Sequence, residues 1–140
     1  MRLARMLVTF ATALLALSAC TPDPGPRVTL GDVEVRVIVA DDEEELARGL
    51  QGYDALPDGT AMLFVFGTPA PRGFAMKGVT FPIDVVFVSA DLEVSAIEPL
   101  DPGDTGVVVS PGPSAYVIEL PQGWAEENGI AVGTSFEFTE

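Results

Sequence analysis

Residues 81–88 read Phe-Pro-Ile-Asp-Val-Val-Phe-Val, and residues 61–66 read Ala-Met-Leu-Phe-Val-Phe. Both runs have the length of a strand, are rich in β-branched and aromatic residues, and are bounded by turn-forming residues. They predict two buried strands at the centre of a sheet. Asp84 interrupts the first run, and an unpaired carboxylate among apolar side chains is energetically costly. We therefore expect Asp84 to have a partner or to lie at the mouth of a cavity.

Upstream of these runs, residues 33–39 alternate between valine and other residues, which predicts a strand with one buried face. The acidic run at residues 41–45 then predicts the start of a helix, because Asp42 and Glu45 have the spacing of a capping box. The helix should end near Gly52. The run lacks the spacing of a calcium-binding loop, so helix capping explains it better than metal binding.

The rest of the domain indicates further short elements. Their brevity and the closely spaced turn residues predict an α+β domain that is mostly β, with a small closed or half-closed barrel as its architecture. The weaker strand candidates are residues 94–97, 106–109, 115–120 and 135–138, and a second short helix is expected over residues 121–128.

Composition limits the classes of function. The 140 residues suffice for one domain, and seven Lys and Arg against 21 Asp and Glu give a net charge of −14. Nucleic acid is an unsuitable partner for such a chain, because phosphate binding needs clustered cations. The chain has no histidine, which excludes serine-histidine triads and histidine-ligated zinc. We expect neither a metal site nor a cofactor.

The N-terminus has the layout of an export signal. Arg2 and Arg5 precede an uncharged apolar stretch that is short for a membrane span, and Leu-Ser-Ala ends it before Cys20. Residues 1–19 therefore read as a signal peptide, Cys20 as a lipidated cysteine in a lipobox-like sequence, and residues 20–29 as a proline-rich tether. The folded domain is expected over residues 30–140, in the cell envelope, facing the periplasm or the exterior. An ordinary cleaved signal followed by a stray cysteine is the alternative.

Several ordered motifs carry a resemblance to a known family. In them the chain resembles the domain of unknown function 192 (DUF192) family, over roughly residues 33–138. The resemblance implies a small β-rich domain, extracytoplasmic or cytosolic, without an established activity. The motifs are Glu45-x-x-Arg48-Gly49-Leu50, Gly59-x-Ala61-Met62-Leu63-Phe64-Val65-Phe66, Phe74-x-Met76-Lys77 with Phe81-Pro82-Ile83-Asp84, Tyr116-Val117-Ile118-Glu119-Leu120-Pro121-x-Gly123-Trp124, and Gly129-Ile130-x-Val132-Gly133.

The chain also departs from the family pattern. Relatives usually read Phe-Trp-Met-Lys-Asn where this chain has Ala75 and Gly78 flanking Met76 and Lys77, and they often carry arginine at the position of Tyr53. If those positions form a ligand site in relatives, this chain lacks an aromatic face, an amide and a guanidinium there.

Charged residues set among apolar ones are the candidates for a site. Lys77 lies seven residues before Asp84, and the two form either a ligand-facing pair or a buried structural bridge. Arg48 and Arg72 are the other basic candidates for pairing with Asp84. The apolar series that includes Met76 predicts either core packing or an apolar pocket with Lys77, Arg48 and Asp84 on its rim.

Glu119 raises the same question on the strand over residues 115–120. A pair of carboxylates, Asp84 and Glu119, would suit the acid and base chemistry of glycoside hydrolysis if they lay at a defined spacing in a groove.

These residues favour a non-catalytic binding or interaction domain over an enzyme. We expect it to be displayed from the membrane by its lipid and to recognise a small ligand, a glycan or an envelope protein. The ligand-binding candidates are Lys77, Asp84, Arg48, Glu119 and Met76. The alternatives are a carboxylate-dependent hydrolase of envelope polysaccharide and a purely structural lipoprotein.

Overall fold

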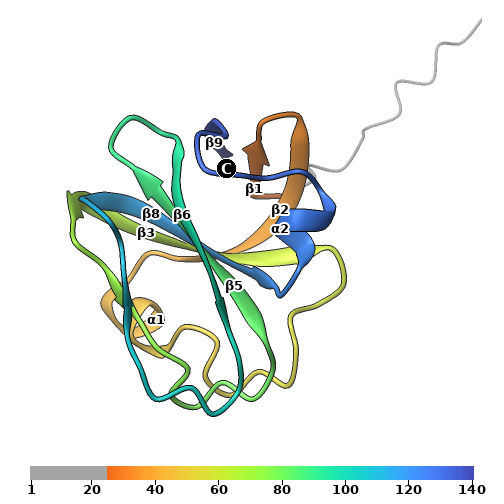
Figure 1. Cartoon of the computed structure of the whole chain (residues 1–140), viewed down its shortest axis with the longest axis vertical. Coiled ribbons are helices and arrows are strands. Elements are labelled where there is room, and N and C mark those ends of the chain that lie inside the picture. Colours follow the sequence, from red (N-terminus) through yellow and green to blue (C-terminus); the bar gives the residue numbers. More distant parts are fainter. Residues whose placement is uncertain (1–24) are drawn as a thin grey trace, which may run out of the picture.

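The structure is a computed structural model that describes residues 25–140, so the expected signal peptide, Cys20 and the start of the tether lie outside the described residues. Seven strands form one sheet in the order β6-β5-β8-β3-β2-β1-β9 (Figure 1). Their bounds are β1 Arg27–Leu30, β2 Val33–Ala40, β3 Thr60–Ala70, β5 Ile83–Ser89, β6 Val94–Leu100, β8 Ser114–Pro121 and β9 Phe136–Thr139.

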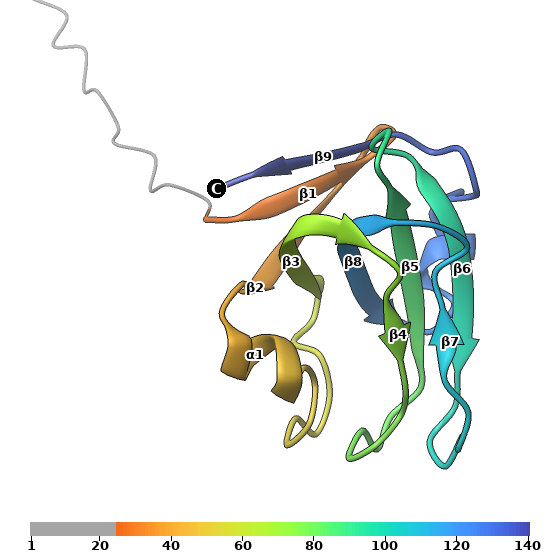
Figure 2. The same ribbon diagram turned by 90° about the vertical axis from the view of Figure 1, so that its left-hand side faces the viewer.

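Two short helices and a small second sheet complete the fold. Helix α1 (Glu43–Arg48) is the crossover between β2 and β3, which are the one parallel pair in the described sheet. Helix α2 (Trp124–Glu127) lies between β8 and β9. Strands β4 (Gly73–Phe74) and β7 (Val108–Val109) pair with each other beside the main sheet (Figure 2). Among residues 25–140, none of the helices has the length and apolarity needed to span a bilayer.

The sheet curls until its two edges meet. An isolated bridge joins Glu93 to Ser135, just outside β6 and β9. The Val94 N–H donates to the Thr134 carbonyl at 2.8 Å, and the Phe136 N–H donates to the Leu92 carbonyl at 2.9 Å. The edges touch only over this short stretch, so the architecture is a half-barrel. The expected fold, mostly β with two short helices, is confirmed.

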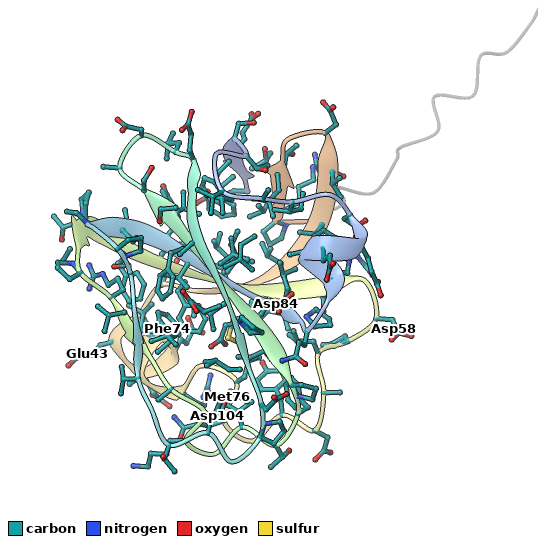
Figure 3. The ribbon with its side chains drawn as sticks, in the orientation of Figure 1. Glu43, Asp58, Phe74, Met76, Asp84 and Asp104 are labelled. Atoms are coloured by element: carbon teal, nitrogen blue, oxygen red, sulfur yellow. The ribbon has the colours of Figure 1, made fainter. Side chains whose placement is uncertain are left out.

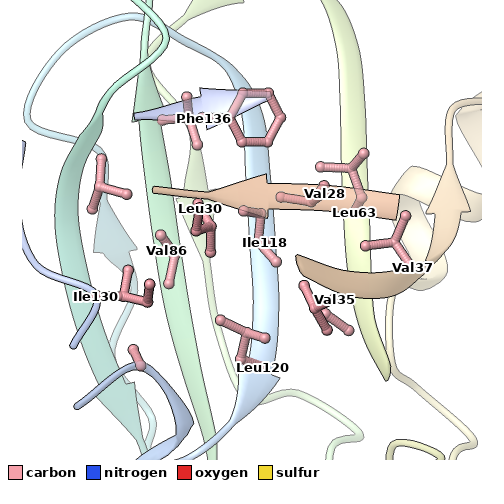
Figure 4. Packing of buried hydrophobic residues seen from close by; sticks show 14 residues of the cluster. Val28, Leu30, Val35, Val37, Leu63, Val86, Ile118, Leu120, Ile130 and Phe136 are labelled. Atoms are coloured by element: carbon pink, nitrogen blue, oxygen red, sulfur yellow. The ribbon is translucent and has the colours of Figure 1, made fainter. Parts of the chain in front are cut away.

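Side chains alternate between the two faces of the sheet, as strand geometry requires, and each face has its own apolar core. The first core lies inside the curl, where side chains of β1, β2, β8 and β9 point toward one another (Figure 4). The second core lies on the opposite face, beneath α1 and β4. On β5, Val86 and Val88 belong to the first core, whereas Val85 and Phe87 belong to the second.

The start of the domain differs from the sequence expectation. Residues 27–29 were assigned to the tether, but they form most of β1, which pairs with β2 on one side and β9 on the other. Val28 is fully buried in the first core. The assignment was wrong because the prolines upstream made the whole stretch look extended and unpaired, while the alternating pattern of β1 is only four residues long.

The helices are shorter than expected, but the cap of α1 was predicted correctly. Asp42 Oδ1 accepts from the Glu45 N–H at 2.8 Å, while Glu45 Oε2 reaches the Asp41 N–H at 3.4 Å rather than that of Asp42. Gly49 ends α1 with φ of 50°, a left-handed conformation that favours glycine. Helix α2 is a single turn inside the expected range of residues 121–128.

Candidate functional site

A pocket of about 320 Å³ lies between α1 and the segment around β4, on the face of the sheet that carries the second core. Helix α1 contributes Arg48, and the loop after it contributes Gln51. The other wall comes from residues 71–75 and Lys77, and the floor includes Glu119 of β8. Arg48, Gln51 and Lys77 are exposed, so the pocket opens to solvent on this side.

Aromatic side chains form one wall of the pocket. The Phe64 and Phe74 rings meet edge to face with centroids 4.9 Å apart, and Phe66 stacks on Phe64 at 6.3 Å. Phe74 also packs on Phe87 below it, at 5.9 Å. Such edge-to-face and stacked contacts stabilise a cluster beyond its buried area, so these rings form a rigid surface.

Three cations line the same pocket, and each is held differently. The Arg72 guanidinium lies 4.0 Å above the Phe66 ring and donates to the carbonyls of Ser114 and Thr68, at 3.2 and 2.6 Å. Arg48 forms an exposed ion pair with Glu44 at 3.6 Å. Lys77 forms no hydrogen bond or ion pair within residues 25–140. Arg72 is therefore fixed by the protein, while Lys77 is available to a ligand.

Glu119 is a buried residue whose carboxyl has no hydrogen-bond partner within residues 25–140. Its side chain is only 4% exposed, and Oε2 accepts and donates no hydrogen bond. The neighbouring strands place Met62 and Val85 directly beside it, and both are apolar. Desolvation by this burial raises the pKa of Glu119 to about 8.

Asp84 lies on the opposite face of the sheet. Val85, not Asp84, is level with Glu119 between β5 and β8, so the two carboxylates point to different sides. Asp84 Oδ2 accepts from the Gly123 N–H at 2.9 Å, at the start of α2. Burial raises the pKa of Asp84, against the lowering effect of its backbone hydrogen bonds to Gly123 and Ala125. In Figure 3, Asp84 lies on the side of α2 and Phe74 on the side of α1.

This placement corrects two expectations. The Lys77–Asp84 pair does not form, because Lys77 lines the pocket and Asp84 faces α2. The paired carboxylates of the hydrolase hypothesis are also wrong, since Asp84 and Glu119 share no groove. Alternation along β5 and β8 separates them, and that depends on the register between strands distant in sequence.

The other candidates divide between pocket and core. Lys77, Arg48 and Glu119 line one pocket, together with aromatic side chains. Met76 is 4% exposed and belongs to the second core rather than to the pocket lining. Sequence reasoning placed Arg72 only as a partner for Asp84, and it missed Gln51. The closeness of Arg72 to Phe74 and Lys77 in the chain was the signal for its role.

A second hollow, of about 560 Å³, lies beside α2. Its lining includes Asp84 and Glu126, and it contains no basic side chain. Within residues 25–140, no group of three or more potential metal ligands is present. Neither of the buried side-chain atoms that lack a partner in the described part of the chain lies in this hollow.

Comparison with known proteins identifies the family. A family model described as Uncharacterized ACR, DUF192, matches residues 27–138. The chain belongs to the DUF192 family. The expected resemblance is thereby confirmed, and the matched region begins with β1 rather than at Leu30.

Two solved structures share the fold of this DUF192 domain. A protein of unknown function from Novosphingobium aromaticivorans has 29% sequence identity and a TM-score of 0.75, with 79% of this chain and 83% of that chain covered. A putative transcription regulator from Sinorhizobium meliloti has 27% identity and a TM-score of 0.73, with 81% and 91% covered. The comparison with curated proteins gave no match.

One of the positions at which this DUF192 domain departs from the usual pattern lines the pocket. Ala75 is exposed at the pocket wall, whereas Gly78 and Tyr53 do not line it. The pocket therefore has a small residue, alanine, at this position of its wall.

Proposed function

We propose that this DUF192 protein is a non-catalytic binding domain that takes a small organic ligand in the pocket beside Lys77. One observation carries the proposal: the pocket gathers Arg48, Arg72 and Lys77 around a rigid aromatic wall. Aromatic side chains with a few convergent polar groups are common in ligand sites, and about 300 Å³ is the lower end of such pockets. The basic residues of the described chain are Arg27, Arg36, Arg48, Arg72 and Lys77.

The positions of the acids favour binding over hydrolysis. Glycoside hydrolysis needs two carboxyl groups about 5–10 Å apart across a cleft, and Asp84 and Glu119 face opposite sides of the sheet. Glu119 is the only acid in the pocket lining. A lone carboxyl among cations and aromatic rings suits recognition of a ligand.

Display from the cell envelope is part of the same proposal. Residues 1–20 have the pattern of a signal peptide ending in a lipidated cysteine. In both views the described chain begins beside the end of β9, while α1 and the loop around β4 lie toward the other end of the domain (Figures 1 and 2). A lipid on Cys20 would thus leave the pocket turned away from the attachment point.

Labelling with palmitate tests the anchor. Cells that express the wild-type chain should incorporate labelled palmitate into a membrane-bound protein, because the lipobox-like Leu-Ser-Ala-Cys directs acylation of the cysteine sulfur. The Cys20→Ser variant should carry no label. Recovery of an unlabelled wild-type protein from the soluble cell interior, with residues 1–19 intact, would contradict the anchor.

A thermal-shift screen tests the pocket. The library should contain amino acids, sugars, sugar acids, nucleotides and aromatic acids. A ligand that binds the folded state raises its melting temperature by mass action. We expect at least one compound to stabilise the wild type and to lose that effect in Lys77→Ala.

Two control variants make the screen specific. Arg36→Ala removes an exposed cation outside the pocket, and Asp84→Asn changes the carboxylate on the other face of the sheet while keeping an acceptor oxygen. Both should respond to the compound as the wild type does. No response to any chemical class would favour a purely structural lipoprotein. Equal loss in Lys77→Ala and Arg36→Ala would show that the compound does not bind in this pocket.

A further inference from the structure

We propose that the pocket selects small organic anions with a flat apolar body, whose anionic group lies among Arg48, Arg72 and Lys77 while one ligand oxygen accepts a hydrogen bond from the Glu119 carboxyl. The inference rests on the proposed binding function and names its ligand class. A carboxylate and a phosphate monoester share the required chemistry.

The first argument is the segregation of charge. The chain has 21 acids against seven basic residues, yet the pocket lining has three basic residues and only one acid, Glu119. A recessed site lined by one sign of charge concentrates ligands of the opposite sign. In a protein as acidic as this one, a cationic pocket therefore favours an anion over a neutral or cationic molecule.

The second argument is that the cations are placed to serve a ligand. Arg72 is fixed over Phe66 and by two backbone carbonyls, so little side-chain entropy is lost when it meets an anion. Arg48 is paired with Glu44 on the surface at 3.6 Å, a weak contact that a better partner can displace. Lys77 has no partner among residues 25–140.

The third argument is the unsatisfied carboxyl on the pocket floor. Oε2 of Glu119 has no hydrogen-bond partner within the described chain and is itself closed to solvent, so the oxygen that can meet a ligand in the pocket is Oε1. A buried polar group without a partner is costly. Because the pKa of Glu119 is raised to about 8, the group is mainly a neutral acid at pH 7 and can donate its proton to a ligand oxygen. An ionised Glu119 would instead repel an anion.

The groups around Glu119 support this assignment. Met62 of β3 and Val85 of β5 flank it and do not titrate. The charged groups that share the pocket are Arg48, Arg72 and Lys77. Tyr53 packs against the same apolar cluster without lining the pocket. The flat body of the ligand would lie against Phe66 and Phe74, which are partly exposed.

Calorimetric titration of the full-length protein in a non-ionic detergent tests the charge selection. The probes share a benzene ring and differ in charge: benzoate, phenyl phosphate, benzyl alcohol and benzyltrimethylammonium. At pH 6.5, the better of the two anions should bind at least about tenfold more tightly than benzyl alcohol, in keeping with one charge-assisted contact. Lys77→Ala should lose most of this difference, and Arg36→Ala should keep it.

A pH series with whichever anion binds tests the role of Glu119. Benzoate stays ionised from pH 6.5 to 9, so a change in its affinity reports on the protein; phenyl phosphate is compared at pH 7.5 and 9. If only protonated Glu119 binds, benzoate affinity should fall about tenfold between pH 6.5 and 9. Glu119→Gln keeps a donor but cannot titrate, so its benzoate affinity, whatever its level, should be the same at pH 6.5 and at pH 9.

Each contrary result is distinct. If benzyl alcohol or benzyltrimethylammonium binds as tightly as the anions, or more tightly, and Lys77→Ala loses that binding, anion selection is overturned. The binding function would still stand. A flat pH profile in the wild type would overturn the contact with Glu119. If no probe binds, the selection proposed here is overturned; if the library screen is silent as well, the binding function falls with it.

Discussion

Glu119 shows how neighbouring strands determine the chemistry of one side chain. Residues of β3 and β5 that are directly level with it, Met62 and Val85, are apolar and offer it no hydrogen bond. Asp84 is also buried, but the Gly123 N–H satisfies it at 2.9 Å. Two acids that look alike in the sequence therefore differ in role: Asp84 binds the start of α2, and Glu119 lies beneath an open pocket.

The raised pKa of Glu119 predicts how stability depends on pH. In the unfolded chain the group loses its proton near the ordinary value of 4.5, while in the folded protein it keeps the proton up to about pH 8. The folded state thus binds more protons between these values, so the free energy of unfolding should fall as pH rises from about 4.5 to about 8 and level off above. Across this pH range, ionisation of Glu119 should lower the free energy of unfolding by on the order of a few kcal/mol.

Urea denaturation at pH 5, 7 and 9 measures this effect. Glu119→Gln removes the titration and keeps the shape, so its stability relative to the wild type should increase from pH 5 to pH 9. The difference between the two proteins isolates Glu119 from the other acids. Parallel pH profiles for wild type and variant would show that Glu119 titrates normally.

Strands β1 and β9 show how terminal elements complete the first core. They pair with each other over residues 27–30 and 136–139, and Phe136 of β9 is 6% exposed. Its ring lies against Tyr116 of β8 with centroids 4.8 Å apart. Because the edge of β6 also bonds to the segment before β9, Phe136 lies where the curled sheet meets itself.

Phe136→Ala tests the importance of this closure. Truncation of a buried phenylalanine costs about 3–5 kcal/mol, because it removes burial and leaves a cavity. Phe138→Ala, two residues away on the same face of β9, is a matched control: its ring is only partly buried, and the loss should be smaller. Urea denaturation of both variants gives the comparison. Equal losses would mean that the ring at the closure contributes no more than the ring nearer the end of β9.

At the scale of the whole molecule, the two faces of the sheet have separate tasks. The curl encloses the first core together with α2 and the terminal strands. The opposite face supports the second core, over which α1 and β4 build the pocket. The pocket is therefore built on the second core and is separated by the sheet from the first.

The local pattern of the sequence was sufficient for the central elements. Alternation predicted β2, apolar runs predicted β3 and β5, and the Asp42 cap of α1 was predicted correctly. These signals act over a few residues, so the sequence carries them directly. The same is true of the family motifs, and the family model matches residues 27–138.

Local sequence patterns did not predict which distant segments pair or contact each other. Residues 27–29 were assigned to the tether because what makes them a strand is pairing with β9, more than a hundred residues away in the sequence. Likewise, the seven-residue spacing suggested that Lys77 meets Asp84, while the register of β5 against β8 turns Asp84 to α2 and Glu119 to the pocket.

The sequence by itself determined the central elements, the mostly β class, the family and the candidate residues Arg48, Lys77 and Glu119. Only the tertiary structure decided that these three share one pocket with Arg72, and that the two buried acids face opposite sides of the sheet. The physical reason is that a strand alternates its side chains with a period of two. Which neighbours then meet depends on register, which long-range packing sets.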